Sequence, residues 1–214
     1  MRLIDVARVA LAPPFCWACG AGARQHEPLC RTCKSRLRWL EREPVELAGV
    51  EVWAPLAYDG PARALVRALK FRGVPGVAWP MSAPMVAAAP PRLLDGSAVL
   101  VPVPLHPRRA RTRGFNQAER LAAALGRRTG MSVEDCLRRR GPAGARQVGR
   151  GRTERLAGIS GAVELRPGAD PPARALLVDD VVTTGATLAA CAAALREGGA
   201  AHVAAIAYAR TPGR

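Results

Sequence analysis

The feature that most constrains the fold is a segment near the carboxyl end, residues 175–199. An apolar run (175–177) is followed by two acids, a Thr/Gly loop and an alanine-rich stretch closed by two glycines. The apolar run predicts a buried parallel strand, and residues 188–197 predict a helix. Ligands bind at the carboxyl edge of open parallel sheets, where such a loop enters a helix. The segment therefore predicts an α/β fold with a ligand site at this edge.

The residue types in this segment indicate a ribose phosphate. The N–H groups of residues 183–187 and the positive end of the following helix dipole suit a phosphate. Asp179 and Asp180 suit vicinal hydroxyls, a magnesium ion, or both. The alternative is an acidic pair that only caps the helix. Because a cap needs one short polar residue and not two acids followed by Thr-Thr-Gly-Ala-Thr, we favour the ribose-phosphate interpretation.

This pattern resembles the PRPP-binding motif of type I phosphoribosyltransferases. The resemblance implies that Asp179 and Asp180 hold the ribose 2′ and 3′ hydroxyls, and that the loop holds the 5-phosphate. The PRPP-binding residues implied in this segment are Asp179, Asp180, Val181, Thr183, Thr184, Gly185, Ala186 and Thr187.

Four cysteines form two CxxC pairs, Cys16 with Cys19 and Cys30 with Cys33. Two such pairs give tetrahedral sulfur coordination, which favours zinc in a closed, structural site. The alternatives are disulfides and a redox CxxC. The first residues lack a signal-peptide apolar stretch, which disfavours disulfides. A redox motif needs one CxxC beside a βαβ pattern.

Two further segments carry basic residues toward the predicted site. A helix opening at Pro61 ends in Lys70 and Arg72, which suit either an anion or the helix dipole; both interpretations stay open. A buried strand over residues 98–101 leads into a proline-stiffened, arginine-rich loop, predicted to stop strand pairing from residue 102 and to clamp pyrophosphate. The alternative is a solvated basic loop. The loop residues expected to contribute are Pro104, Leu105, His106, Arg108, Arg109 and Arg113.

The charge distribution indicates an anionic partner. The chain of 214 residues has a net charge of +15, and residues 108–155 alone hold 14 arginines and four acids. A polyphosphate or a nucleic acid fits this excess. Residues 137–159 are expected to form a mobile loop that closes over a polyphosphate or holds a single strand, although the segment lacks stacking aromatics. No run of about 18 apolar residues is present, so we expect a cytoplasmic protein without membrane insertion.

Together these motifs resemble the ComF family of phosphoribosyltransferase-like proteins. The likeness rests on the cysteine pairs, on residues 68–73 (ALKFRG), 102–109 (PVPLHPRR) and 113–117 (RGFNQ), and on the acidic loop. It implies a zinc ribbon (1–45) on a type I phosphoribosyltransferase domain (50–214), magnesium with PRPP, and a role in DNA uptake during competence. Residues 144–147 (GARQ) and 155–159 (RLAGI) depart from the family's usual pattern in the expected closing loop.

Two classes of function follow. The first is a phosphoribosyltransferase in which Asp179, Asp180 and Arg113 act at the reacting centre on an unidentified acceptor. Some type I enzymes carry an acid in the phosphate loop that serves as a base, whereas this chain has Thr183. The second is a non-catalytic PRPP sensor that binds single-stranded DNA or a DNA-uptake helicase. The basic segment favours the second class, and the scarcity of aromatic residues opposes it.

Overall fold

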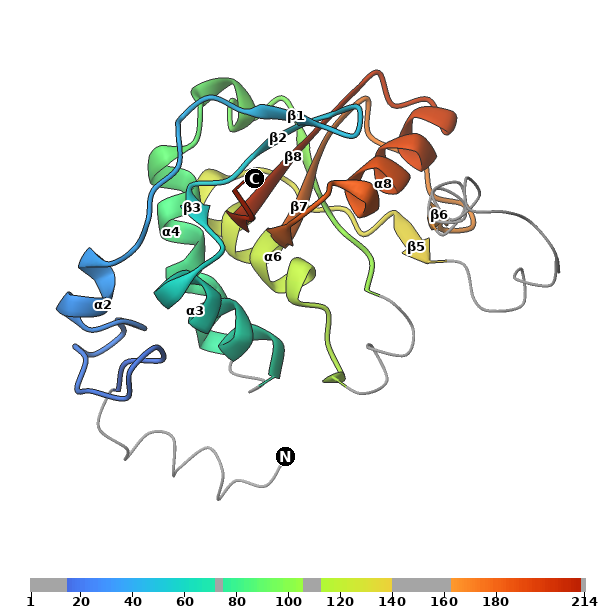
Figure 1. The fold of residues 1–214 in the computed structure, drawn as a ribbon. Helices are drawn as coiled ribbons and strands as arrows, with labels where there is room; N and C mark the ends of the chain where they lie inside the picture. Colours follow the sequence, from blue (N-terminus) through green and yellow to red (C-terminus); the bar gives the residue numbers. More distant parts are fainter. Residues whose placement is uncertain (1–14, 72–74, 106–112, 140–162, 213–214) are drawn as a thin grey trace, which may run out of the picture.

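A computed structural model describes residues 15–71, 75–105, 113–139 and 163–212. Its centre is a mostly parallel sheet with strand order β1-β2-β8-β7-β4, in which β3 also pairs with β8 (Figure 1). The strands are β1 (Val45–Leu47), β2 (Val50–Trp53), β3 (Leu56–Ala57), β4 (Val99–Pro102), β7 (Arg174–Val182) and β8 (His202–Arg210). Among the described strands of this central sheet, only β1 and β2 pair antiparallel. The predicted α/β class with a parallel central sheet is therefore confirmed.

Helices cover both faces of the sheet (Figure 1). The two longest strands, β7 and β8, alternate their side chains between the faces. Leu176 and Val178 pack with the helices α3 (Gly60–Phe71), α4 (Ala78–Ala88) and α6 (Gln117–Thr129). Leu177 packs instead with α8 (Ala186–Glu197). Because both faces are apolar, β7 has the continuous hydrophobic run that is typical of a central parallel strand. Two short 3₁₀ helices, Pro75–Val77 and Pro91–Leu93, flank α4.

The cysteine-rich segment contacts the same core through a short helix, α2 (Arg31–Ser35). Cys16, Leu29 and Cys33 are buried in the cluster formed by the α3, α4 and α6 side of the sheet. A bridge between Trp39 and Leu56 continues this connection. The division at residues 45–50 stays a prediction, although β1 shows that the sheet begins before residue 50.

Several element boundaries differ from the sequence-based predictions. β1 lies before residue 50, where the phosphoribosyltransferase-like domain is expected to begin, and residues 50–57 form two strands, β2 and β3. Pro102 pairs with Val178 in β4, so the prediction that strand pairing stops at residue 102 is wrong. The proline is tolerated because β4 is the edge strand and the N–H of Val103 donates to the Val178 carbonyl. The predicted loop 137–159 begins instead as strand β5 (Leu137–Arg139), paired antiparallel with β6 (Val163–Leu165). Residues 140–159, the rest of that loop, lie outside the described residues.

Within the described ranges, no helix is both long and apolar enough to span a bilayer.

Candidate functional site

The loop between β7 and α8 forms a small concavity of about 50 Å³ at the carboxyl edge of the sheet. Asp179 and residues 181–188 line it. The N–H groups in the first turn of a helix have no partner within the helix, so α8 presents donors toward this space. The helix α8 begins at Ala186, two residues earlier than the sequence predicted. The concavity therefore brings together one carboxylate, hydroxyl groups and a helix N-terminus. These are the kinds of group that can bind a diol and a phosphate.

Gly185 makes this tight turn from strand to helix. Its φ is 78°, a conformation that side chains rarely adopt. A Cβ built there would lie 3.0 Å from Cβ of Leu47 and 3.2 Å from the Leu47 carbonyl oxygen. The loop between β7 and α8 is therefore pressed against β1, and glycine is required both by its backbone angle and by the close approach of that strand.

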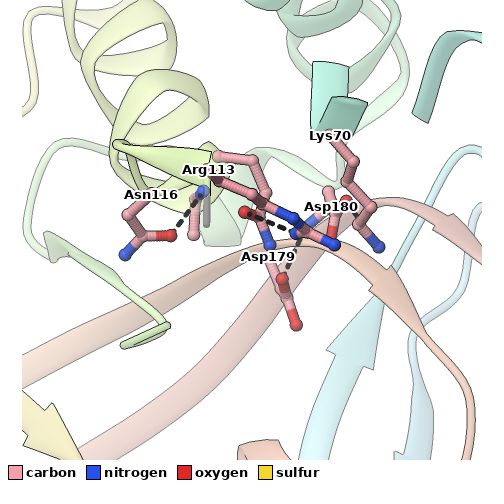
Figure 2. Close-up of polar contacts among 7 residues, drawn as sticks. Lys70, Arg113, Asn116, Asp179 and Asp180 are labelled. Carbon is pink, nitrogen blue, oxygen red and sulfur yellow. Dashed lines mark hydrogen bonds and ion pairs between the residues drawn. The ribbon is translucent and has the colours of Figure 1, made fainter. Parts of the chain in front are cut away.

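The two neighbouring aspartates face opposite sides of the sheet, because successive strand residues alternate. Asp180 points toward α3, where Nζ of Lys70 lies 2.9 Å from its Oδ2 (Figure 2). The Asp180 side chain is 3% exposed and that of Lys70 is 19% exposed. Asp179 lies instead on the α8 side and lines the concavity. One acid is thus held in a buried ion pair while the other faces the predicted phosphate loop.

Asp179 is held in an environment that disfavours its ionised form. Burial raises the pKa of Asp179 well above its ordinary value, and the negative charge of Asp180 raises it further. The backbone N–H of Asp180 donates to Oδ1 of Asp179 at 2.8 Å and partly offsets this rise (Figure 2). A bound cation or hydroxyl donors would favour the ionised carboxylate. Burial and the neighbouring charge therefore favour the protonated form of Asp179.

The start of α6 brings Arg113 and Asn116 to the same edge. Asn116 caps α6 by accepting from the N–H of Ala118 at 3.0 Å, and its Nδ2 donates to the Val103 carbonyl, also at 3.0 Å. This buried amide fixes the helix start against the end of β4. The guanidinium of Arg113 donates to Oε1 of Gln117 at 3.3 Å, and Figure 2 shows its side chain extending toward the acid pair.

The structure brings together only some of the predicted ligand-binding residues. Lys70, Arg113, Asp179 and Asp180 gather at one edge of the sheet, and Pro104 and Leu105 follow β4 at that edge. Arg72, His106, Arg108 and Arg109 lie outside the described residues. The capping role of Asn116 was missed at the sequence level, although an Asn followed three residues later by Glu119 is a helix-start signal.

The four cysteines Cys16, Cys19, Cys30 and Cys33 come together as predicted, with all sulfur atoms within 4.8 Å of one another. Sγ of Cys19 and Sγ of Cys30 are 3.8 Å apart. A tetrahedron with Zn–S bonds of about 2.3 Å has sulfur–sulfur edges of about 3.8 Å, so the cluster fits zinc. The four cysteines can therefore hold a zinc ion.

Two of these thiols differ strongly in acidity. Burial opposes ionisation of Cys16, but hydrogen bonds from the backbone at Cys30, Cys19 and Ala18 lower its pKa to about 6. Burial raises the pKa of Cys33 to about 12. Since metal binding requires deprotonated thiols, loading the site must displace protons, including the proton of Cys33.

Known proteins that are similar to this chain include a competence protein and an enzyme of purine biosynthesis. No family model matches the chain. Over 103 residues the chain is 37% identical to the competence protein ComFC of Streptococcus pneumoniae (strain ATCC BAA-255 / R6), a match covering 48% of this chain and 44% of that protein. The match thus spans less than half the length of its curated relative. Among solved structures, the allosteric regulatory enzyme of purine biosynthesis matches 66% of this chain and 30% of its own, at 19% identity and a TM-score of 0.39. The similarity to ComFC confirms the resemblance to the ComF family that the sequence motifs indicate.

Proposed function

We propose that this protein binds PRPP at the carboxyl edge of β7, with the 5-phosphate on residues 183–187 and the ribose hydroxyls on Asp179, which Asp180 helps to position. One observation carries the proposal: Asp179 lines the same concavity as the phosphate loop. A phosphate cradled at a helix N-terminus, with a carboxylate beside it, matches the two ends of a ribose 5-phosphate.

The proposal gives the two aspartates different tasks. Asp179 contacts the hydroxyls or a magnesium ion, which accepts carboxylate ligands. Asp180 is fixed by Lys70 in the buried ion pair, and its backbone N–H orients the neighbouring carboxylate through the 2.8 Å hydrogen bond. Lys70 is therefore a positioning residue in this account, acting through Asp180.

Transfer of the phosphoribosyl group is the proposed reaction. The bond between C1 and the pyrophosphate oxygen breaks, the electron pair leaves with pyrophosphate, and an acceptor supplies the new bond to C1. Arg113 and the loop from Pro104 offer positive charge and backbone donors to the leaving group, and magnesium would neutralise part of its charge. Thr183 offers no carboxylate base, so the acceptor must lose its proton to another group or to water.

The remaining parts complete the proposed architecture. Residues 1–45 form a zinc ribbon with a structural role, because four thiolates close the metal's coordination shell. Residues 50–214 form the phosphoribosyltransferase-like domain. The likeness to a competence protein supports a role in competence. We propose that this role is in DNA uptake and that the protein acts in the cytoplasm.

A second candidate, a non-catalytic protein that binds single-stranded DNA or a helicase, has one specific observation in its favour. Trp79 is 43% exposed, and the guanidinium groups of Arg128 and Arg127 lie 3.8 Å and 5.4 Å from its ring centroid. An exposed ring beside positive charge is the combination that single-strand binding surfaces use. The position of Trp79 beside two arginines thus partly answers the objection that the chain has few aromatic residues for stacking on bases.

A turnover experiment separates the two candidates. Zinc-loaded protein is incubated with labelled PRPP, magnesium and fractionated cell metabolites, and pyrophosphate release is measured. The enzyme predicts acceptor-dependent release that Asp179→Asn abolishes and that Asp170→Asn, the same change at an exposed loop position, leaves intact. PRPP binding without any acceptor-dependent release would leave the sensor as the function.

A further inference from the structure

A second cavity, distinct from the phosphate-loop concavity, lies between the β4–α6 connection and the β5–β6 hairpin. Its volume is about 420 Å³, within the range of small-molecule sites. One wall is formed by Pro104, Leu105 and the residues at the start of α6, and the other by arginines on and beside β5 and β6. The lining residues are Pro104, Leu105, Gly114, Phe115, Asn116, Glu119, Arg138, Arg139 and Arg166.

Most polar groups of this cavity already have partners. Arg138 pairs with Glu164, and Arg166 pairs with Asp135. Asn116 uses both ends of its amide in capping α6 and in holding the Val103 carbonyl. These groups shape the cavity but have little left to offer a ligand.

Arg139 differs from its neighbours. It is half-buried, and among the described residues it forms no ion pair with a carboxylate. Its Nε donates to the Pro104 carbonyl oxygen at 3.1 Å, which ties β5 to the connection after β4. The two terminal nitrogens then form the fork that binds a carboxylate through two parallel hydrogen bonds.

The rest of the lining selects among anions. Pro104, Leu105 and Phe115 provide an apolar wall, which suits an organic body. Glu119 lines the same cavity and disfavours a doubly charged ligand such as a phosphate monoester. The ring of Phe115 is already covered on one face by the Arg120 guanidinium, 3.7 Å from its centroid, so this part of the wall is held in place.

From this lining we propose that the cavity is a binding site for a small organic monocarboxylate, with its carboxylate on the Arg139 fork and its apolar body against Leu105 and Phe115. This site goes beyond the proposed PRPP function, although it shares Pro104 and Leu105 with the loop proposed to bind pyrophosphate. Because Arg139 also holds the Pro104 carbonyl, the ligand sits directly against the connection that begins the predicted pyrophosphate loop.

Calorimetric titration with benzoate tests the proposal on the zinc-loaded chain. We expect benzoate to bind the native protein and Arg138→Gln, the matched change on the same strand, and to bind Arg139→Gln about tenfold more weakly or worse. Arg139→Lys keeps the charge but not the fork and should fall between them. Phenyl phosphate, acetate and benzyl alcohol should each bind more weakly than benzoate, since each lacks one matching feature.

Three results would overturn this site. The first is that benzoate does not bind the native protein at millimolar concentrations. The second is that Arg139→Gln binds benzoate as tightly as the native protein. The third is that Arg138→Gln and Arg139→Gln lose the same benzoate affinity. Unliganded melting temperatures of the variants check that each is folded. Asp179→Asn separates this site from the PRPP proposal, because it should keep benzoate binding; if it loses benzoate binding, the anion lies at the acid pair and the cavity assignment is wrong.

Discussion

Removing the Lys70 ammonium should destabilise the fold through Asp180. In Lys70→Met the apolar stem remains, but the Asp180 carboxylate, 3% exposed, loses the ammonium 2.9 Å away. Breaking a buried ion pair at one partner costs about 3–5 kcal/mol. Since Lys70 itself is 19% exposed and water reaches its end of the pair, we expect the lower end, about 3 kcal/mol. For a chain of this size that corresponds to a drop of roughly 6–12 °C in Tm.

The assay is thermal and urea unfolding of the zinc-loaded variants at neutral pH. The matched control is Arg67→Met, on an exposed position of the same helix, which should shift Tm by less than about 2 °C. Adding Asp180→Asn to Lys70→Met should restore most of the lost stability, because the uncompensated charge is then gone. The reasoning fails if Lys70→Met and Arg67→Met have the same Tm, or if adding Asp180→Asn to Lys70→Met lowers the stability further.

Three other predictions concern the phosphate loop and the metal. Gly185→Ala should cost about 1–3 kcal/mol, since it adds strain at φ 78° and a Cβ 3.0 Å from that of Leu47; Gly168→Ala, with φ 74° and open space, should cost less in the same unfolding assay. Asp179→Asn should raise the free energy of unfolding of the unliganded protein, and this gain should grow as pH rises above about 4. The reason is that a carboxyl with a raised pKa in the folded state stabilises the fold only while it is protonated. A stability difference that stays constant across pH 4–8 would contradict the burial of this charge. Metal analysis should find one zinc per chain, and chelation should lower Tm, because Cys16 and Cys33 lie in the main core; unchanged Tm after complete zinc loss would contradict a structural role.

Local patterns in the sequence predicted the elements that depend on neighbouring residues. The apolar run before Asp179 predicted β7, and the spacing of the cysteines predicted a four-sulfur cluster. The structure contains β7 and α8 where the sequence predicted a strand and a helix, and it brings the four thiols close together. Each of these features is encoded within a few residues of chain.

Features that depend on distant segments were not predictable in the same way. The Lys70–Asp180 pair joins residues 110 positions apart, and sequence spacing left the role of Lys70 open between an anion site and a helix end. The β5–β6 hairpin pairs strands on either side of residues 140–162, so no local turn signal announces it. The opposite orientation of the two aspartates follows from strand alternation, but only once β7 is known to continue through Val182.

Binding of PRPP with magnesium, measured by calorimetry on the zinc-loaded chain, tests the central claim most directly. The account predicts binding by the native protein and by Asp170→Asn, and a loss of at least about tenfold in affinity for Asp179→Asn, whose amide cannot coordinate magnesium as a carboxylate does. No PRPP binding by the native protein, or equal affinities for Asp179→Asn and Asp170→Asn, would contradict the assignment of a ribose-phosphate site to the end of β7.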